Sequence, residues 1–183
     1  LGSLNRQFDI VESAGVLHHM KDPMAGWKAL TNCLKPGGLM KIALYSALAR
    51  KNIVQMRHEI QELSINSGDV GMKLFRQHVV NSEKEHHKQI LLSPDFYCLS
   101  GVRDLLFHVQ EHRFTIPEIK ESLAQLDLDF CGFEFRSDKK VDKFNSQVSE
   151  QNAVYDLDKW DGFEKGNPTT FFGMYQFWCQ KVI

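Results

Sequence analysis

The stretch that decides the fold runs from Phe8 to Tyr45. It opens with FDIVES at Phe8–Ser13, where apolar and polar residues alternate as in a half-buried β-strand. It ends with the mostly apolar run LMKIALY at Leu39–Tyr45, which predicts a strand buried on both faces. Between the two, Asp22 followed by Pro23 is typical of a helix start. The order strand, helix, strand predicts a βαβ unit with parallel strands and a right-handed crossover.

The helix of this unit has one apolar face and a clear end. Its large apolar residues recur at spacings of three and four, namely Met24, Trp27, Leu30 and Leu34. Residues 35–38, Lys-Pro-Gly-Gly, predict the end of the helix and a turn, because proline cannot continue a helix and glycine permits a tight backbone.

Two segments of this unit are candidate parts of a binding site. Open parallel sheets bind ligands beyond the carboxyl ends of their strands. Residues 13–19 follow the first predicted strand, and Tyr45 and Ser46 end the second. Because the two strands are predicted to be neighbours, we expect these segments to lie close together.

The middle of the chain predicts a helical insertion, at about residues 47–112, that covers the strand ends. One helix face carries apolar residues at helical spacing, namely Ile53, Met56, Ile60 and Leu63. Residues 67–69, Ser-Gly-Asp, break this pattern, and further short helices are expected up to about Leu106. Within them, residues 85–88, Glu-His-His-Lys, are expected to form an exposed helix face.

The last third of the chain predicts a helix and two further strands. Thr115 and Glu118 have the spacing of a capping box, which predicts a helix start. Residues 128–135 predict a strand with a bulge at Gly132, and residues 169–182 predict a long strand inside the sheet. No helical pattern is evident in residues 136–168, so we expect the last two strands to pair antiparallel.

Composition sets limits on partners and location. The 183 residues carry 22 basic and 23 acidic side chains, so the formal charge of −1 gives no argument for nucleic-acid or membrane-surface binding. No apolar run reaches the roughly 20 residues of a membrane-spanning helix. The cysteines, Cys33, Cys98, Cys131 and Cys179, are widely spaced, which is typical of reduced thiols in a cytoplasmic protein.

The residues of the βαβ unit resemble a known family. The run FDIV at 8–11, VLHHM at 16–20, Asp-Pro at 22–23 and LKPGG at 34–38 is similar to the middle of class I S-adenosylmethionine-dependent methyltransferases of the ubiquinone-biosynthesis-like branch. That family has the sheet order 3-2-1-4-5-7-6 with strand 7 antiparallel. The resemblance therefore implies a Rossmann-like α/β sheet with strands 4-5-7-6, the last one antiparallel, and a helical insertion.

The chain departs from the family in one respect. The family's glycine-rich cofactor loop after strand 1 and its acidic residue after strand 2 have no counterpart here, and the chain begins at Leu1 without a methionine. We therefore expect residues 1–183 to be the C-terminal half of a single methyltransferase domain. Its partner would be the N-terminal remainder of the same polypeptide, and this half alone is expected to bind the cofactor weakly or not at all and to be inactive.

The resemblance implies roles for the residues at the strand ends. S-adenosylmethionine is the expected cofactor, and its methionine part would lie along the segment after the first strand, at Ser13, Ala14, Gly15, His18 and His19. Methyl transfer needs mainly alignment of donor and acceptor, so no fixed catalytic motif is expected, and His19 and Tyr45 are the catalytic candidates. The acceptor, a small molecule or a protein, is not named by any residue.

Acceptor contacts and two other functions remain open. The acceptor candidates are Tyr45, Ser46, His108 and Glu111. His108, Glu111 and His112 also match the H-x-x-E-H pattern of zinc peptidases, which would make the protein a zinc hydrolase, but the pattern is short and we predict no metal site. A further alternative is a non-catalytic domain that keeps the methyltransferase fold.

Overall fold

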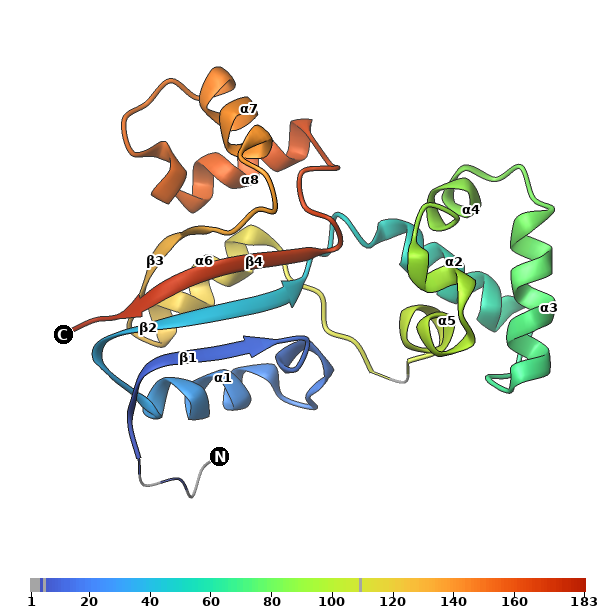
Figure 1. Ribbon diagram of the computed structural model, residues 1–183, viewed down its shortest axis with the longest axis horizontal. Helices are drawn as coiled ribbons and strands as arrows, with labels where there is room; N and C mark the ends of the chain where they lie inside the picture. The colour runs from blue at the N-terminus through green and yellow to red at the C-terminus, as the bar shows by residue number, and fades with distance from the viewer. Residues whose placement is uncertain (1–3, 5, 109) are drawn as a thin grey trace. The chain divides into compact units, whose positions relative to one another are not determined.

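The structure is a computed structural model that describes Leu4, residues 6–108 and residues 110–183. It is an α/β protein with helices and a mixed four-stranded sheet (Figure 1). Within the described ranges, no helix combines the length and the apolar character needed to cross a lipid bilayer.

Contacts divide the chain into two compact units. The sheet unit comprises Leu1–Ala49 and Glu111–Ile183, and the helical unit comprises Arg50–Gln110. The helical unit falls within the stretch 47–112 for which we expected an insertion. Each unit has its own cluster of buried apolar side chains, so each is described by itself. That the whole chain is the C-terminal half of one domain stays a prediction.

The strands of the sheet unit confirm the predicted topology. They are β1 (Phe8–Ala14), β2 (Leu34–Tyr45), β3 (Leu128–Phe133) and β4 (Met174–Lys181). The spatial order is β1-β2-β4-β3 (Figure 1). β1 and β2 run parallel, whereas β4 is antiparallel to both of its neighbours. This is the predicted order 4-5-7-6 with an antiparallel last strand.

The described helices of the sheet unit are η1 (Leu17–His19), α1 (Pro23–Asn32), α6 (Ile116–Gln125), α7 (Lys139–Gln147), η3 (Ala153–Tyr155) and α8 (Leu157–Gly166). Two of them, α1 and α6, begin where local signals predict. At the start of α1, Asp22 Oδ1 accepts a hydrogen bond from the Ala25 amide at 2.9 Å. At the start of α6, Thr115 and Glu118 form the predicted capping box. Both helix starts are therefore confirmed.

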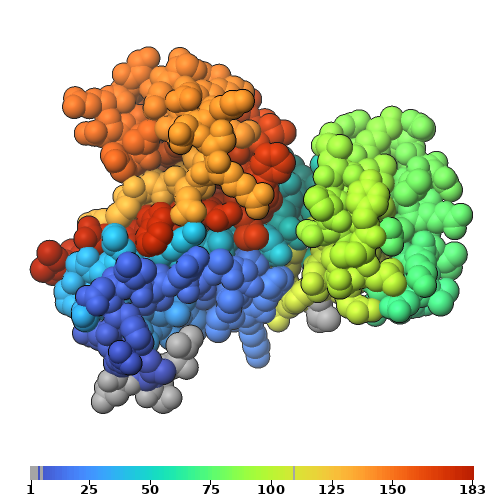
Figure 2. Space-filling model, in the orientation of Figure 1, coloured from blue at the N-terminus to red at the C-terminus, as the bar shows by residue number. Residues whose placement is uncertain are grey.

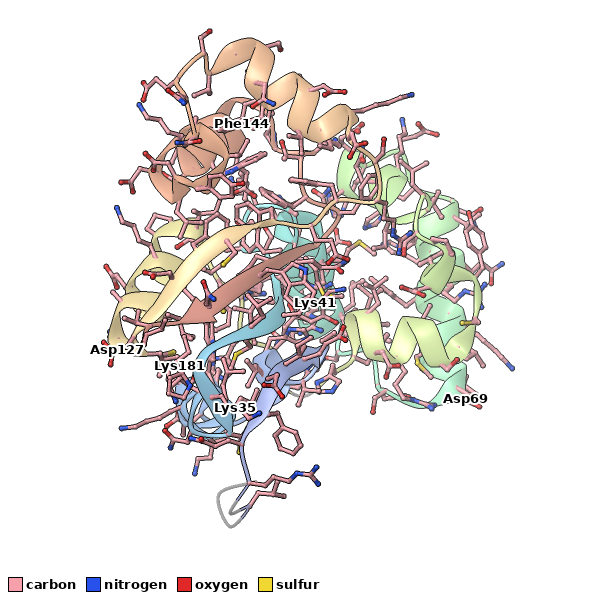
Figure 3. All side chains as sticks on the ribbon, turned by 60° about the vertical axis from the view of Figure 1, so that its left-hand side comes forward. Lys35, Lys41, Asp69, Asp127, Phe144 and Lys181 are labelled. Carbon is pink, nitrogen blue, oxygen red and sulfur yellow. The ribbon has the colours of Figure 1, made fainter. Side chains whose placement is uncertain are left out.

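The far end of α1 is tied to the last strand. The Nζ atom of Lys181, in β4, donates hydrogen bonds of 2.9 Å to the carbonyl oxygens of Thr31 and Leu34 (Figure 3). A cation at a helix C-terminus satisfies carbonyl groups that lack partners within the helix and interacts favourably with the helix dipole. The contact joins residues that are about 150 positions apart in sequence.

One face of the sheet carries the core. Large side chains of β2 and β4 are buried there with residues of α1, α6 and α8, and they are Met40, Ile42, Leu44, Tyr175 and Phe177. On the opposite face, Lys41 Nζ donates to Glu134 Oε1 at 2.9 Å, and Trp178 Nε1 donates to Glu134 Oε2 at 2.9 Å. The prediction that the second strand is buried on both faces is wrong, because its second face carries this half-exposed polar group.

β1 is an edge strand. Its one partner among the described residues is β2, and Ile10 on it is 60% exposed. Figure 2 shows the blue atoms of the first strand and helix at the surface of the sheet unit. The unpaired backbone of an edge strand is a ready template for pairing with another strand.

Three predicted boundaries are corrected by the structure. β2 begins at Leu34 rather than Leu39, because residues 35–38 bulge between the paired positions Phe8↔Leu34 and Ile10↔Leu39. β4 is shorter than the predicted strand 169–182, since Gly173, at φ +80°, turns the chain just before Met174. β3 ends at Phe133 rather than at residue 135, and its register shifts next to Gly132, as the predicted bulge requires.

The expectation of no helix in residues 136–168 is also wrong. Residues 139–147 form α7 and residues 157–166 form α8. Asp156 caps the start of α8, because its Oδ1 accepts hydrogen bonds from the amides of Asp158 and Lys159. Both helices are short and rich in charged residues, and large aromatic side chains rather than a long apolar stripe hold them in the core.

The helical unit contains α2 (Lys51–Glu62), α3 (Asp69–Val80), α4 (Glu85–Ile90), η2 (Pro94–Tyr97) and α5 (Leu99–Leu106). The break at residues 67–69 separates α2 from α3, as predicted. Of the predicted face of α2, Ile53, Met56 and Ile60 are buried, whereas Leu63 lies outside the helix and is half exposed. Val102, Leu105 and Leu106 recur at helical spacing in the sequence, and Val109, the next residue of that pattern, lies outside the described residues.

The prediction of an exposed helix face at residues 85–88 is wrong. His87 is fully buried, and His86 is largely buried. The reason is a partner on another helix, because both rings face Glu59 of α2. Burial lowers the pKa of His87, although its hydrogen bond to Glu59 acts in the opposite direction.

Candidate functional site

The ends of β1 and β2 lie side by side, as the βαβ prediction requires. The two parallel strands pair in register up to Ala14 and Ala43. The segment after β1 and the last residues of β2 therefore leave the sheet at the same end, the carboxyl end of both strands. Open parallel sheets bind their ligands at this end.

The backbone after β1 is accessible. Ser13 is buried, whereas Ala14, Gly15 and Val16 are exposed. Gly15 has φ +73°, a conformation that favours glycine, and a Cβ atom placed on it would meet no other atom within 4 Å. The turn thus presents open backbone at the strand end, where a ligand can approach closely.

Three rings meet beside this turn. The His18 ring stacks on the Tyr45 ring with centroids 3.7 Å apart and planes at 23°. The His19 ring packs edge-on against Tyr45 at 5.5 Å and against His18 at 4.5 Å. The structure therefore brings together the predicted cofactor residues His18 and His19 and the predicted acceptor residue Tyr45.

The segment that follows the helical unit in sequence supports these rings. The His112 amide donates a 2.7 Å hydrogen bond to the His18 carbonyl, and the Phe114 amide donates one of 2.8 Å to the Tyr45 carbonyl. The Ala47 amide in turn donates to the Phe114 carbonyl at 2.8 Å, so Ser46 and Phe114 form a parallel bridge. Residues 112–114 thus fix both the turn after β1 and the end of β2.

Ser46 belongs to a buried hydrogen-bond network that sequence reasoning missed. Its hydroxyl donates to Glu164 Oε1 at 3.2 Å, and the Tyr175 hydroxyl lies 2.7 Å from Glu164 Oε2. All three residues are nearly inaccessible to solvent. Glu164 lies 118 positions from Ser46, and one acidic residue in a polar helix gives no signal of its burial.

Burial sets the protonation behaviour of this network. It raises the pKa of Glu164, because a carboxylate is poorly solvated there, while the hydrogen bonds from Tyr175 and Ser46 act in the opposite direction. Burial also raises the pKa of the Tyr175 hydroxyl, which therefore remains a donor.

The Glu164→Gln variant should reveal this raised pKa. A group whose pKa is raised on folding adds stability below its unfolded pKa, near 4.5, and that contribution is lost as pH rises through the folded value. We therefore expect the free energy of unfolding of the wild type to fall relative to that of Glu164→Gln as pH increases from about 4.5 to 7.

Urea unfolding at four or five pH values measures this difference. Glu121→Gln, which removes a carboxylate from the exposed surface of α6, is the matched control for the change in net charge. A difference between wild type and Glu164→Gln that is independent of pH would contradict the assignment.

The remaining predicted residues follow α5. His108 Nδ1 lies 2.8 Å from the Gln110 carbonyl oxygen in the helical unit. The Glu111 side chain is buried in the sheet unit, with its Oε1 atom 3.9 Å from Arg113 Nη1. A zinc-peptidase motif needs its two histidines one turn apart on a helix, but α5 ends at Leu106 and the described residues from 107 to 114 contain no helix. The interpretation of His108, Glu111 and His112 as a zinc-hydrolase motif is therefore wrong.

Comparison with known proteins agrees with this geometry. Residues 3–42, which include β1, α1 and most of β2, match the model of the methyltransferase domain family. The α/β fold of this chain matches that of a methyltransferase. The match to the family model includes residues 13–19 but ends before Tyr45.

Relatives and solved structures extend the likeness beyond the matched segment. An uncharacterized protein of Synechococcus sp. is 28% identical over 174 residues, which cover 89% of the chain and 41% of that protein. The structure of PKMT2 from Rickettsia typhi has a TM-score of 0.65 at 13% identity and matches 98% of this chain and 36% of its own. The same protein in complex with AdoHcy gives the same values. The methyltransferase fold here thus spans less than half the length of the proteins it matches.

Proposed function

We propose that this chain takes part in methyl transfer from S-adenosylmethionine, as the C-terminal part of a donor-binding domain. The observation that carries the proposal is the meeting of the turn after β1 with the end of β2, where His18 stacks on Tyr45. The Rickettsia typhi neighbour supports it, because one of its structures is a complex with AdoHcy, the product left when the donor loses its methyl group.

The residues at the strand ends fit the methionine part of this donor. The exposed backbone at Ala14 and Gly15 and the open space over Gly15 leave room for a close approach. Ser13, His18 and His19 flank this backbone with polar atoms. When bound, S-adenosylmethionine would supply an activated methyl group, and these residues would hold its methionine end beside Tyr45.

The chain's own contribution to the reaction is then mainly alignment. Bringing two reactants into one geometry can lower a barrier without any acid or base. The stack of His18 on Tyr45 and the hydrogen bond from His112 hold the donor turn in place. His19 and Tyr45 are the candidates to take a proton from an acceptor that has one to lose.

The methyl acceptor would bind where β2 ends. We place a small-molecule or protein acceptor near Tyr45 and Ser46 of the sheet unit. Nucleic acid and membrane are not proposed as partners, because the net charge is −1. A cytoplasmic location is proposed because all four cysteines are free thiols.

A non-catalytic domain with the same fold is the alternative. The glycine-rich loop and the acidic residue that hold the rest of the donor in this family have no counterpart in these 183 residues. In the proposed function, this loop and this acidic residue belong to the remainder of the polypeptide. The alternative predicts that even the full-length gene product does not bind the donor.

Titration calorimetry with S-adenosylmethionine separates the two functions. We expect saturable binding by the full-length gene product and weak or no binding by residues 1–183 alone. Ultraviolet cross-linking of labelled donor should then mark peptides that contain residues 13–19. No binding by the full-length product, or label confined to peptides from residues 50–110, would refute the proposal.

A further inference from the structure

A second polar cluster lies within the helical unit, and the proposed methyl transfer does not use it. It consists of Glu59 from α2 and of His86 and His87 from α4. Among the described residues, these three form the group of histidine, cysteine and acidic side chains whose ligand atoms converge, all within 4.8 Å of one another. The side chains of Glu59, His86 and His87 are 13%, 18% and 0% exposed, so the cluster is shielded from solvent.

Both imidazole rings direct Nε2 at the same carboxylate. His87 Nε2 lies 2.5 Å from Glu59 Oε2, and His86 Nε2 lies 3.5 Å from Glu59 Oε1. His86 Nε2 is buried and makes no hydrogen bond with any described residue. A buried ring nitrogen without a hydrogen bond is costly unless a partner occupies the space in front of it.

The distance between His86 Nε2 and Glu59 Oε1 suits two ligands of one metal ion better than it suits a hydrogen bond. Ligand bonds of about 2.0–2.1 Å place two ligands of a tetrahedral ion about 3.3–3.5 Å apart. The His86–Glu59 separation of 3.5 Å matches this value. The His87–Glu59 contact is a hydrogen bond, and it would lengthen by about 1 Å to admit an ion between the two atoms.

The site already holds a positive charge. The Lys84 ammonium contacts Glu59 Oε1, the oxygen that faces His86. The Lys84 side chain is half exposed, so it can move into solvent without disturbing the core. The ammonium thus occupies a position where a metal cation could replace it.

We propose that Glu59, His86 and His87 bind a divalent transition-metal ion of the Zn²⁺ type. Two imidazole nitrogens and one carboxylate are ligands of Zn²⁺, whereas Mg²⁺ and Ca²⁺ prefer oxygen ligands alone. Three protein ligands leave a fourth position to water. Because the ligands come from two helices, the ion would link α2 to α4 within the helical unit, whatever the activity of the sheet unit.

A purely structural role makes a different prediction for Lys84. If the cluster only links two helices through hydrogen bonds, Lys84→Met removes one link, lowers the melting temperature and creates no metal affinity. If the cluster is a metal site, Lys84→Met removes the competing cation and tightens Zn²⁺ binding. The two roles therefore predict opposite changes in the response to metal.

The experiment titrates Zn²⁺ into the 183-residue chain and records stoichiometry, affinity and melting temperature. The Cys98→Ser background removes an exposed thiol that could bind the ion. We expect one equivalent to bind and to raise the melting temperature, since an ion that binds the folded state stabilises it. Co²⁺, as a probe of geometry, should give the visible absorption of a nitrogen- and oxygen-ligated ion, and Mg²⁺ should not compete.

Matched variants locate the site. Glu59→Gln and His86→Ala should weaken Zn²⁺ binding by at least about tenfold, as the loss of a ligand requires. Their controls are Glu62→Gln and His58→Ala, an exposed pair on α2 whose loss should leave the affinity unchanged. Circular dichroism confirms that each variant is folded.

One equivalent of Zn²⁺ that is lost in Glu59→Gln and His86→Ala and tightened in Lys84→Met supports the site. No saturable binding overturns it, as do equal affinities in the cluster variants and their controls, or a Lys84→Met variant without increased affinity.

Discussion

Replacing Trp160 with alanine is expected to lower the free energy of unfolding of the sheet unit by about 3–5 kcal/mol, the usual cost of removing a buried tryptophan. The Trp160 ring is 1% exposed and stacks on Phe144 with centroids 3.8 Å apart (Figure 3 labels Phe144). It also packs edge-on against Phe133 of β3 at 5.5 Å. The cavity would separate α7 and α8 from the sheet.

The ring also makes one polar contact. Trp160 Nε1 donates a 3.0 Å hydrogen bond to the Val154 carbonyl. Trp160→Phe keeps an aromatic ring in the core but leaves that carbonyl without its donor, so a cost between those of wild type and alanine is expected.

Tryptophan fluorescence in urea measures this effect for the sheet unit alone. The three tryptophans are Trp27, Trp160 and Trp178, and none lies in the helical unit. The other two remain as reporters when Trp160 is removed. The control is Phe172→Ala, at a ring that is 95% exposed, which should change the free energy by less than about 0.5 kcal/mol. A cost for Trp160→Ala below about 1 kcal/mol would contradict its place in the core.

The second large effect concerns the candidate site, and it rests on the proposed function. Tyr45→Ala in the full-length gene product is expected to weaken S-adenosylmethionine binding by at least about tenfold, or roughly 1.4 kcal/mol. Tyr45 supports the His18 ring, which lies in the turn that would hold the donor. Without this support the turn loses the contact that orders it.

Two further variants show which part of Tyr45 matters. Tyr45→Phe keeps the stacked ring and should bind the donor far more tightly than the alanine variant does. Tyr155→Ala removes a mostly exposed tyrosine of the same unit and should leave binding unchanged. If Tyr45→Phe loses as much affinity as Tyr45→Ala, the hydroxyl rather than the ring is the important group, and the argument from stacking is wrong. Calorimetric titration provides the dissociation constants.

The βαβ part of the fold was predictable because its signals are local. The Asp22-Pro23 helix start and the alternation of Phe8–Ser13 act over a few residues, and the structure confirms both. The capping box at Thr115 is equally local. Residue spacing alone did not predict the order of all four strands. That order was predicted from the resemblance to a known family.

Contacts between distant residues explain what could not be predicted. Half of the residues of α8 are charged, and the helix is held by Trp160 and Phe163, which pack against a sheet and a helix formed elsewhere in the chain. His87 is buried because Glu59, 28 residues earlier, faces it. Glu164 joins Ser46 across 118 residues. No pattern within a short window contains such partners, although the helical spacing of Leu157, Trp160 and Phe163 could have revealed α8.

The parallel bridge between Ser46 and Phe114 has a consequence for how such a protein can diversify. The chain leaves the sheet at Ser46 and returns to it at Phe114, and these two residues are bridged by hydrogen bonds. The ends of the intervening segment are therefore held together whatever its length. Closing a longer loop costs little additional entropy, because that cost grows only with the logarithm of length. A different segment could therefore replace residues 50–110 while β1 and β2 keep their register.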